Sequence, residues 1–394
     1  MQHNNIEKTS LALSPFVLSY VLAMDIIIPS LPEFIVFFNA TQATVQLIIS
    51  LFPIAAGIMQ IFMGPMLDRF GRKRISIYCS IGYIAASILC AYSTTLTQLN
   101  ISRFLEALFS TGLFLTAFAV ISDNYENNVS ARGFNYMNTI MSVSPLIAPA
   151  IGSWLDILYG WRASFIFLSI IGLFALYVST TCVTDKIKQP EIIKNKIIKD
   201  YCTIFKNRDF LIYTYAVMAG LTYLFIFFST SPYIIEKLLD YTKLQFSFWF
   251  AFMGIAVLLG SFISARIVFK LGIYKTVLAG IILTLSGGII MLGWYMIFGL
   301  SIYNFVLPML LIGIGAVFCM GSGMAGAVQL FPKITGTASA AVCSVEFILS
   351  ALIGTLIMLL PVTSSNSFSV PVVIMSIIGL FFMFFVSSKK KQSH

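Results

Sequence analysis

Long apolar stretches alternate with short polar breaks along the whole chain. About a dozen stretches reach the roughly 20 apolar residues that a helix needs to cross the hydrocarbon core of a bilayer. Their apolar positions are continuous and do not alternate, which argues against the strands of a membrane β-barrel. The pattern predicts twelve transmembrane helices, over residues 11–32, 42–66, 75–95, 97–122, 134–157, 162–184, 210–235, 245–268, 273–297, 303–329, 336–360 and 368–387.

The composition agrees with this pattern. Hydrophobic residues make up 59% of the chain and charged residues only 10%, and the mean hydropathy is +0.94. A soluble domain carries about 25% charged residues to cover its surface, so lipid must cover most of the surface here. We therefore predict an all-α membrane protein and not a soluble enzyme.

The lysines and arginines predict how the helices are oriented. If both termini are cytoplasmic, 20 of the 24 bases fall in cytoplasmic breaks, as expected because cationic loops stay on that side of the membrane. The net charge of +9 is then a signal of topology. A nucleic-acid partner is not expected, because no soluble domain offers a basic face.

The longest polar break divides the chain into two parts of six helices each. It carries seven bases among isoleucines, which predicts a basic amphipathic linker on the anionic inner leaflet. The predicted domains are an N-terminal six-helix bundle, the cytoplasmic linker and a C-terminal six-helix bundle, over residues 1–184, 185–209 and 210–394.

Glycines and prolines at matching places suggest that the two bundles are internal repeats. We expect corresponding residues to close helices 2 and 8, to end helices 1 and 7, and to open helices 5 and 11. The three pairs are Gly64 and Gly260, Pro29 and Pro232, and Gly133 and Gly336, with separations of 196, 203 and 203 residues. Three similar separations favour a two-fold transporter architecture.

The break between the second and third helices holds the most specific motif, GPMLDRFGRKR at residues 64–74. It matches the G-x-x-x-D-R-x-G-R-[RK] signature and so resembles the major facilitator superfamily. The resemblance implies two pseudo-symmetric bundles and a cytoplasmic gate whose charges pair in one conformation and separate in the other. A solvated basic loop is the alternative. The predicted gate residues are Gly64, Asp68, Arg69, Gly71, Arg72 and Asp123.

An acid in the outer half of the first helix narrows the resemblance to one group within the superfamily. The sequence DIIIPSLP, starting at Asp25, is similar to the D-x-x-x-P-x-L-P of drug:proton antiporters of the bicyclomycin-resistance type. Burying an ionised carboxylate near lipid costs several kcal/mol, so Asp25 is expected to face a cavity, take up a proton or pair with a base. The alternative is a carboxylate satisfied at the outer interface near Pro29.

Other charges within predicted helices are candidates for proton coupling. Arg103 lies in a segment similar to the helix 4 motif that the superfamily links to proton transfer, and it could hold Asp25 ionised. Alternatively, Arg103 and Glu106 neutralise each other on one helix face. Glu346 is the one clear acid in the membrane region of the C-terminal half. It could bind a proton or a substrate cation, or it could snorkel or bond to Ser344 or Ser350.

The fifth helix contains Pro145, Pro149 and Gly152 and partly resembles the helix 5 signature of exporters, without the glycine before its second proline. Prolines interrupt the backbone ladder and small residues allow close helix contact, so we predict a hinge there. The corresponding C-terminal loop, residues 260–272, lacks the Asp-Arg pair. The gate is therefore expected to be asymmetric.

Little in the sequence points to a metal or a cofactor. Six cysteines show no CxxC spacing, and the two histidines lie at the chain ends. We expect no cofactor, no metal and no ATP-binding loop. Aromatic residues could line a pocket for flat or cationic solutes, the speculative set being Tyr20, Tyr136, Phe225, Phe228 and Tyr233.

The function predicted on this basis is proton-coupled antiport by a monomer in the bacterial inner membrane. The expected cargo is a drug or a small endogenous metabolite such as a siderophore, and the other partners are protons and membrane lipid. Two alternatives stay open: a proton-coupled nutrient importer of the same fold, and a membrane receptor or scaffold that transports nothing. The sequence does not name the substrate.

Overall fold

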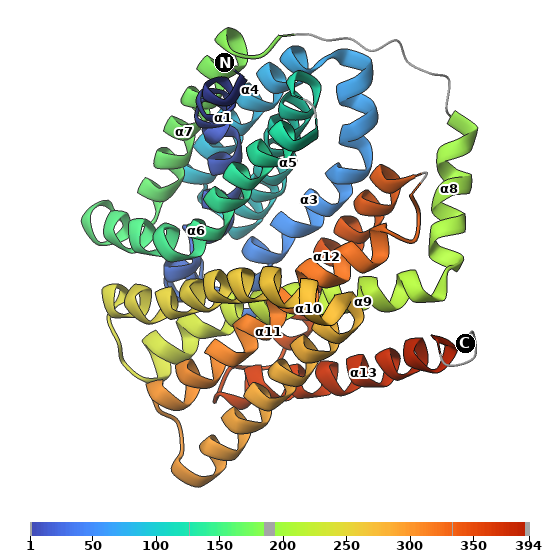
Figure 1. Cartoon of the computed structure of the whole chain (residues 1–394). Helices are drawn as coiled ribbons and strands as arrows, with labels where there is room; N and C mark the ends of the chain where they lie inside the picture. The colour runs from blue at the N-terminus through green and yellow to red at the C-terminus, as the bar shows by residue number, and fades with distance from the viewer. Residues whose placement is uncertain (1, 126, 185–193, 333, 391–394) are drawn as a thin grey trace. The chain divides into compact units, whose positions relative to one another are not determined.

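The computed structural model describes residues 2–125, 127–184, 194–332 and 334–390. The chain divides into two compact units, Met1–Ile192 (unit 1) and Ile193–His394 (unit 2). Helices dominate both units, and the described residues contain no β-strand (Figure 1). The expectation of an all-α architecture is therefore confirmed.

Unit 1 is built from long helices joined by short turns. Helix α1 contacts α5, α6 and α7, and α4 contacts both α5 and α7. A short 3-10 turn, Ile28–Ser30, follows α1. The helices are α1 (Gln2–Asp25), α2 (Leu31–Phe37), α3 (Gln42–Phe70), α4 (Arg72–Ala91), α5 (Leu96–Asn124), α6 (Asn127–Tyr159) and α7 (Arg162–Thr181).

Unit 2 packs α10 against α11 and α13, and α9 against α11 and α12. A π-helical turn, Tyr233–Leu238, continues α9. The helices are α8 (Lys194–Lys206), α9 (Arg208–Pro232), α10 (Lys243–Phe298), α11 (Ile302–Val328), α12 (Thr335–Ile357) and α13 (Asn366–Lys390).

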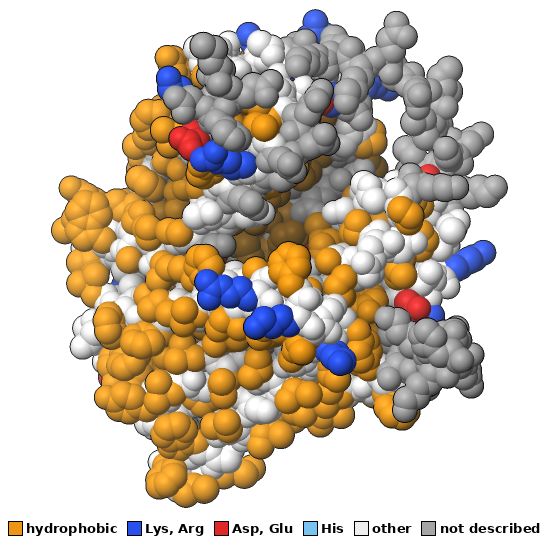
Figure 2. Space-filling model, viewed as in Figure 1, with side chains coloured by type: hydrophobic (Ala, Val, Ile, Leu, Met, Phe, Trp, Pro, Cys, Tyr) orange, Lys and Arg blue, Asp and Glu red, His pale blue; other side chains and the backbone are white. Residues whose placement is uncertain are grey.

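Among the described residues, eleven helices are long and apolar enough to cross a membrane. The longest of them, α10, has 56 residues and joins two helices across Gly272, whose backbone is non-helical at φ 76° and ψ 168°. Division at Gly272 gives twelve spans, with a break where the sequence predicts one between residues 268 and 273. Apolar side chains cover much of the surface of both units (Figure 2), as a lipid-facing surface requires.

Side-chain caps set the starts of four long helices. Thr41 and Thr95 accept from backbone N–H groups of α3 and α5, and Thr242 and Ser301 do the same for α10 and α11. Each start is a capping box, because the residue three positions later bonds back to the cap. The two units thus begin corresponding helices with the same device.

The structure shows which positions of the two repeats correspond more clearly than the sequence did. Asn39 and Asp240 both have positive φ, Thr41 and Thr242 both cap helices, and Gly71 and Gly272 share φ near 80°. Each pair is 201 residues apart. Some sequence landmarks were wrong: α3 runs past Gly64, α10 past Gly260, and Gly133 lies inside α6 because that helix starts at Asn127, whereas Gly336 does open α12.

The predicted linker is only partly described, since residues 185–193 lie outside the described part of the chain. The rest forms α8, which contacts α9 and α12. Ile204 is fully buried in an apolar cluster with Phe210 and Val217, and Tyr201 packs against that cluster. Burial raises the pKa of the Tyr201 phenol. The described part of the linker is thus docked on unit 2 by its apolar face.

Candidate functional site

A buried arginine ties three helices of unit 1 together. Arg103 of α5 is fully buried. Its Nη2 donates to the carbonyl oxygen of Ala23 in α1 at 3.0 Å, and its Nε donates to that of Ile48 in α3 at 3.4 Å. The guanidinium also lies over the ring of Phe52, 4.7 Å from its centroid, a favourable cation–π position.

The counter-charge of this arginine comes from its own helix. Arg103 Nη1 lies 2.5 Å from Glu106 Oε2, and both side chains are fully buried. The second oxygen, Glu106 Oε1, accepts from the hydroxyl of Ser87 in α4 at 2.7 Å. The alternative prediction, a pair that neutralises itself one turn apart, is therefore what the structure contains.

Asp25 is the last residue of α1 and only 4% exposed. Its Oδ2 accepts from the hydroxyl of Ser144 in α6 at 3.0 Å. Among the described residues it forms no ion pair, so the predicted Asp25–Arg103 pair is absent from this conformation. Arg103 instead holds the carbonyl of Ala23, two residues before Asp25. The two groups are thus linked through the backbone of α1.

The predicted gate residues are partly brought together. Arg72 Nε lies 2.7 Å from Asp123 Oδ2, with both side chains under 10% exposed, and Arg72 Nη1 donates to the carbonyl oxygen of Leu67 at 2.8 Å. Gly71 turns the chain between α3 and α4 at φ 87°, which favours glycine. Arg69 is exposed. The side chain of Asp68 lies outside the described part of the structure.

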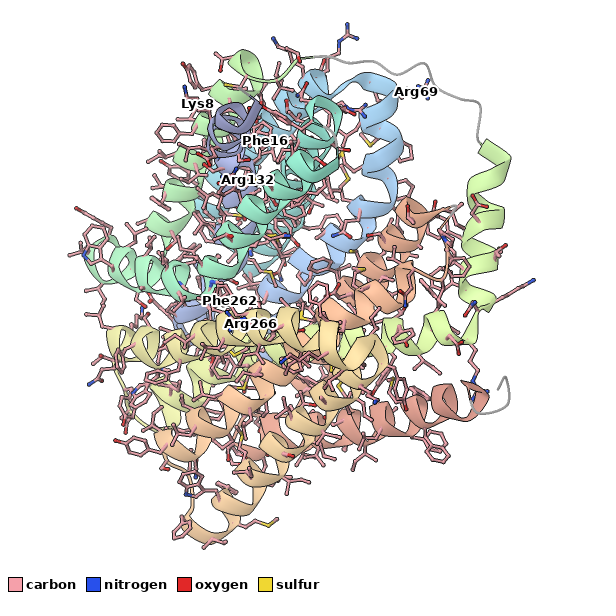
Figure 3. The ribbon with its side chains drawn as sticks, viewed as in Figure 1. Lys8, Phe16, Arg69, Arg132, Phe262 and Arg266 are labelled. Carbon is pink, nitrogen blue, oxygen red and sulfur yellow. The ribbon has the colours of Figure 1, made fainter. Side chains whose placement is uncertain are left out.

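The corresponding loop in unit 2 has no such pair. Arg266 and Lys270 are exposed on α10, and neither forms an ion pair within the described part of the chain. Figure 3 shows Arg266 one turn beyond the exposed Phe262. Among the described residues, this turn of unit 1 therefore has an ion pair that the corresponding loop of unit 2 lacks. The asymmetric gate itself stays a prediction.

All three predicted hinge residues lie inside α6. Pro145 and Pro149 interrupt its backbone hydrogen bonds. A Cβ atom at Gly152 would collide with the carbonyl oxygen of Ile26. The small residue is needed because the backbones of α6 and α1 approach closely there.

The aromatic residues proposed for substrate binding are divided between the two units. In unit 1, Tyr20 packs on the rings of Phe52 and Phe114, and Tyr136 donates its hydroxyl to Glu7, which also pairs with Arg132. The other three residues belong to unit 2 and are buried: Phe225, Phe228 and Tyr233. Their role in binding stays a prediction.

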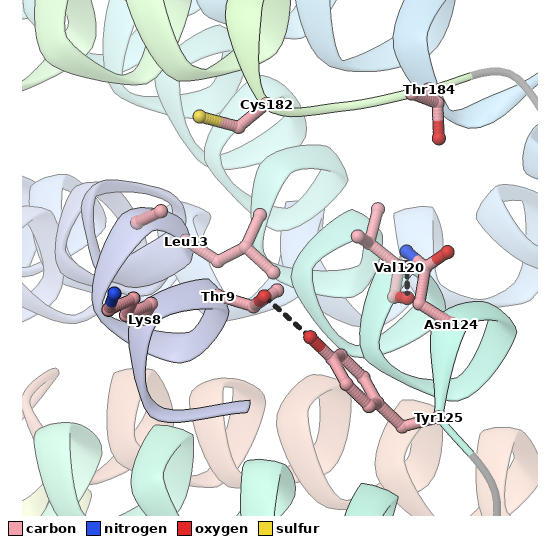
Figure 4. Close-up of a pocket in the computed structure, with 9 residues that line it drawn as sticks. Lys8, Thr9, Leu13, Val120, Asn124, Tyr125, Cys182 and Thr184 are labelled. Carbon is pink, nitrogen blue, oxygen red and sulfur yellow. Dashed lines mark hydrogen bonds between the residues drawn. The ribbon is translucent and has the colours of Figure 1, made fainter. Parts of the chain in front are cut away.

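Two features escaped the sequence analysis. Asp156 is 6% exposed and accepts from the hydroxyl of Ser30 at 2.6 Å, joining α6 to the turn after α1. The sequence signal that could have identified Asp156 is an acid near the end of an apolar stretch. Unit 1 also has a cavity of about 570 Å³ whose lining includes Lys8, Asn124 and Cys182, with Thr9 bonded to Tyr125 at its edge (Figure 4).

In unit 2, Glu346 is 6% exposed on α12. The predicted bond to Ser344 or Ser350 is not formed: the hydroxyl of Ser350 donates to the carbonyl oxygen of Met218, and that of Ser344 has no partner among the described residues. The snorkelling alternative does not fit the burial. Glu346 therefore needs another explanation.

Twelve apolar spans in two related units, with charged side chains buried among them, define a secondary transporter of the membrane. The Major Facilitator Superfamily model matches residues 13–354, and the chain belongs to this family. The predicted family is thus confirmed. The match begins in α1 and ends in α12, so it covers most of both units.

Relatives of named function agree with this assignment. The chain is 28% identical over 363 residues to the "Chloramphenicol resistance protein" of Pseudomonas aeruginosa, covering 91% of this chain and 85% of the relative. It is 23% identical to the "Bicyclomycin resistance protein homolog" of Haemophilus influenzae, covering 85% and 84%. The bicyclomycin-resistance type of resemblance is therefore confirmed.

Solved structures support the fold alone. A peptide transporter crystallised with sulfate superposes with a TM-score of 0.81 at 12% identity, covering 98% of this chain and 94% of the other. At this identity the likeness says nothing about cargo. It does confirm the predicted two-bundle fold of this superfamily.

Proposed function

We propose that this protein is a proton-coupled antiporter that exports drugs or a small endogenous metabolite by alternating access. The observation that carries the proposal is the set of carboxylates buried within the apolar spans of unit 1. Asp25 and Glu106 are both at most 4% exposed, and intramembrane acids of this kind are expensive and usually functional. The names of the relatives, which refer to drug resistance, support the same conclusion.

Asp25 is the proposed proton carrier. Its carboxylate receives one hydrogen bond, from Ser144 on the predicted hinge helix. Protonation removes the negative charge of Asp25 and so weakens its hydrogen bond with Ser144. The contact between α1 and α6 therefore depends on whether Asp25 carries the proton. The Arg103–Glu106 pair is the proposed positioning element, because it fixes the backbone of α1 two residues before Asp25.

The proposed cytoplasmic gate is the ion pair of Arg72 and Asp123, together with the turn at Gly71. A buried pair made in one conformation and broken in the other biases the two states by its own free energy. Because both residues belong to unit 1, the gate acts on the ends of α4 and α5. The proposed location is the bacterial inner membrane, crossed many times by a monomer with lipid around it and with both termini in the cytoplasm.

Everted membrane vesicles with an acidified lumen test this function. We would add chloramphenicol, bicyclomycin, amino acids and hydroxycarboxylate siderophores in turn and follow proton release with a pH-sensitive dye. Wild-type protein should release protons with at least one compound, and Asp25→Asn should insert in the membrane but release none. Asp240→Asn is the matched control, since Asp240 is an exposed loop residue and the chemical change is identical.

Two results would remove the proposal. If Asp25→Asn releases protons as the wild type does, Asp25 is not the carrier. If wild-type vesicles respond to no compound while intact cells accumulate one of them, the protein is an importer. Receptors or scaffolds would move neither solute nor protons in either assay.

A further inference from the structure

Helix α1 stops at the candidate proton carrier. Asp25 is its last residue, and the 3-10 turn Ile28–Ser30 separates α1 from α2. The last turn of a helix carries the negative end of the helix dipole and carbonyl groups without helical partners. The electrostatic surroundings of Asp25 therefore depend on where α1 ends, and so on what holds the turn after it in place.

One anchor of this turn is a second buried acid. Asp156 of α6 is 6% exposed and Ser30 only 1%. The hydroxyl of Ser30 donates to Asp156 Oδ2 at 2.6 Å, near the short end of the range for O–H···O bonds. A hydrogen bond between groups shielded from water is strengthened by the low local dielectric, and breaking it leaves a buried polar group unsatisfied at a cost. The bond therefore holds the turn against α6.

Ser30 uses its hydroxyl for this contact and not for its own helix. It stands at the N-cap position of α2, where a serine commonly accepts from backbone N–H groups of the first turn. Here its backbone is helical, at φ −88° and ψ −5°, and its side chain makes no cap hydrogen bond. The side chain of Ser30 thus stabilises a contact between helices instead of the start of α2.

Helix α6 reaches the turn at a second point on the same face. The carbonyl oxygen of Ile26 lies where a Cβ atom of Gly152 would be, and positions 152 and 156 are one helical turn apart. One turn of α6 thus contacts both ends of the segment between α1 and α2, residues 26–30. Ser144 of α6 also bonds to Asp25 itself. Helix α6 therefore fixes the carboxyl group directly and through the chain that follows it.

We propose that Asp156 is a positioning residue for proton coupling, which sets the surroundings of Asp25 by fixing the turn between α1 and α2 through Ser30. This inference rests on the proposed function, since it gives Asp156 a part in the coupling that Asp25 carries out. Asp156 acts on Asp25 through the backbone of residues 26–30. Loss of the bond to Ser30 frees the turn and admits water to the end of α1.

Carbodiimide labelling of Asp25 tests this role without any transported solute. N,N′-dicyclohexylcarbodiimide reacts with carboxyl groups that are protonated and lie in apolar surroundings, and mass spectrometry of the digested protein shows which acid is labelled. The labelling rate of Asp25 would be measured on the purified full-length protein in lipid nanodiscs at a fixed pH. We expect Asp156→Ala and Ser30→Ala each to slow labelling at least about threefold. The double variant should be no slower than the slower single variant, because both changes remove the same bond.

Two control variants separate positioning from general damage. Asp156→Asn keeps an oxygen that accepts from Ser30, so Asp25 should be labelled within about twofold of the wild-type rate. Ser19→Ala removes a buried hydroxyl of α1 that donates within its own helix, to the carbonyl oxygen of Phe16, and should leave the rate unchanged. Thermal melting shows whether each variant is folded. If Asp156→Ala does not fold, Ser30→Ala carries the test, because it removes the same bond and keeps the acid.

Three results would overturn the assignment. An unchanged labelling rate in folded Ser30→Ala protein would show that the bond does not set the surroundings of Asp25. Labelling in Asp156→Asn as slow as in Asp156→Ala would show that Asp156 acts by another route than this bond. Wild-type Asp25 that takes no label would show that its surroundings are not the apolar ones that the turn is proposed to maintain.

The inference and the proposed function can fail separately. If Asp25→Asn releases protons in the vesicle assay as the wild type does, Asp25 is not the carrier, although the labelling differences among the Ser30 and Asp156 variants would remain. If the vesicle assay succeeds and the labelling rates do not differ, Asp25 stays the carrier and Asp156 does not position it.

Discussion

The carbonyl oxygen of Ile26 occupies the space that a Cβ atom would need at Gly152. This contact brings the backbones of α1 and α6 together one residue beyond Asp25 and three residues beyond Pro149. Side chains would otherwise hold the two helices apart, since interiors are close-packed. The candidate proton carrier and the candidate hinge are thereby parts of one helix contact.

Gly152→Ala should therefore damage the protein although it adds only one methyl group. The added atom meets backbone, which cannot rotate away, so we expect a loss of about 1 to 3 kcal/mol or more. Gly64→Ala is the control, because no atom lies within 4 Å of a Cβ there. Thermal melting in detergent would measure the stability of both variants. A Gly152→Ala protein with the melting temperature of the wild type would refute the close approach.

The pair of Arg103 and Glu106 should show strong coupling in a double-mutant cycle. Either Arg103→Gln or Glu106→Gln leaves one buried charge alone, which costs about 3 to 5 kcal/mol. Glu106→Gln should be the worse of the two, because a guanidinium cannot shed its proton whereas a carboxylate can take one up. The double variant should regain much of the loss. Unfolding measurements that give additive losses would contradict this account.

Arg72 should be needed for transport because of its pairing and not only its charge. Arg72→Ala breaks the ion pair with Asp123 and the bond to the carbonyl of Leu67, so we expect export to fall at least about tenfold. Arg72→Lys should restore only part of the export, since an ammonium group cannot make the two directed hydrogen bonds of a guanidinium. Arg74→Ala removes an exposed base from the same segment and should have little effect on drug efflux rates in whole cells. Equal losses of efflux in Arg72→Ala and Arg74→Ala would show that the segment acts only through its positive charge and not as a gate.

Much of the architecture could be predicted from the sequence because it depends on local patterns. Apolar length fixed the spans, including the break near Gly272, and the charged turn around Gly71 identified the family. The partner of Arg72 could be named in advance only through the resemblance. Helix ends were less accurate, as Gly64 and Gly133 show, since small residues serve both as breaks and as close-packing positions.

The sequence by itself determined which residues are membrane-embedded and which faces of their helices are polar. Only the tertiary structure decided that Arg103 pairs with Glu106 and not with Asp25, that Ser144 reaches Asp25, and that no described residue forms a hydrogen bond or an ion pair with Glu346. Helical periodicity sets the direction of a side chain within its own helix. The partners that the side chain meets on other helices, such as Ala23 for Arg103 and Ser144 for Asp25, are set by packing that no local pattern records.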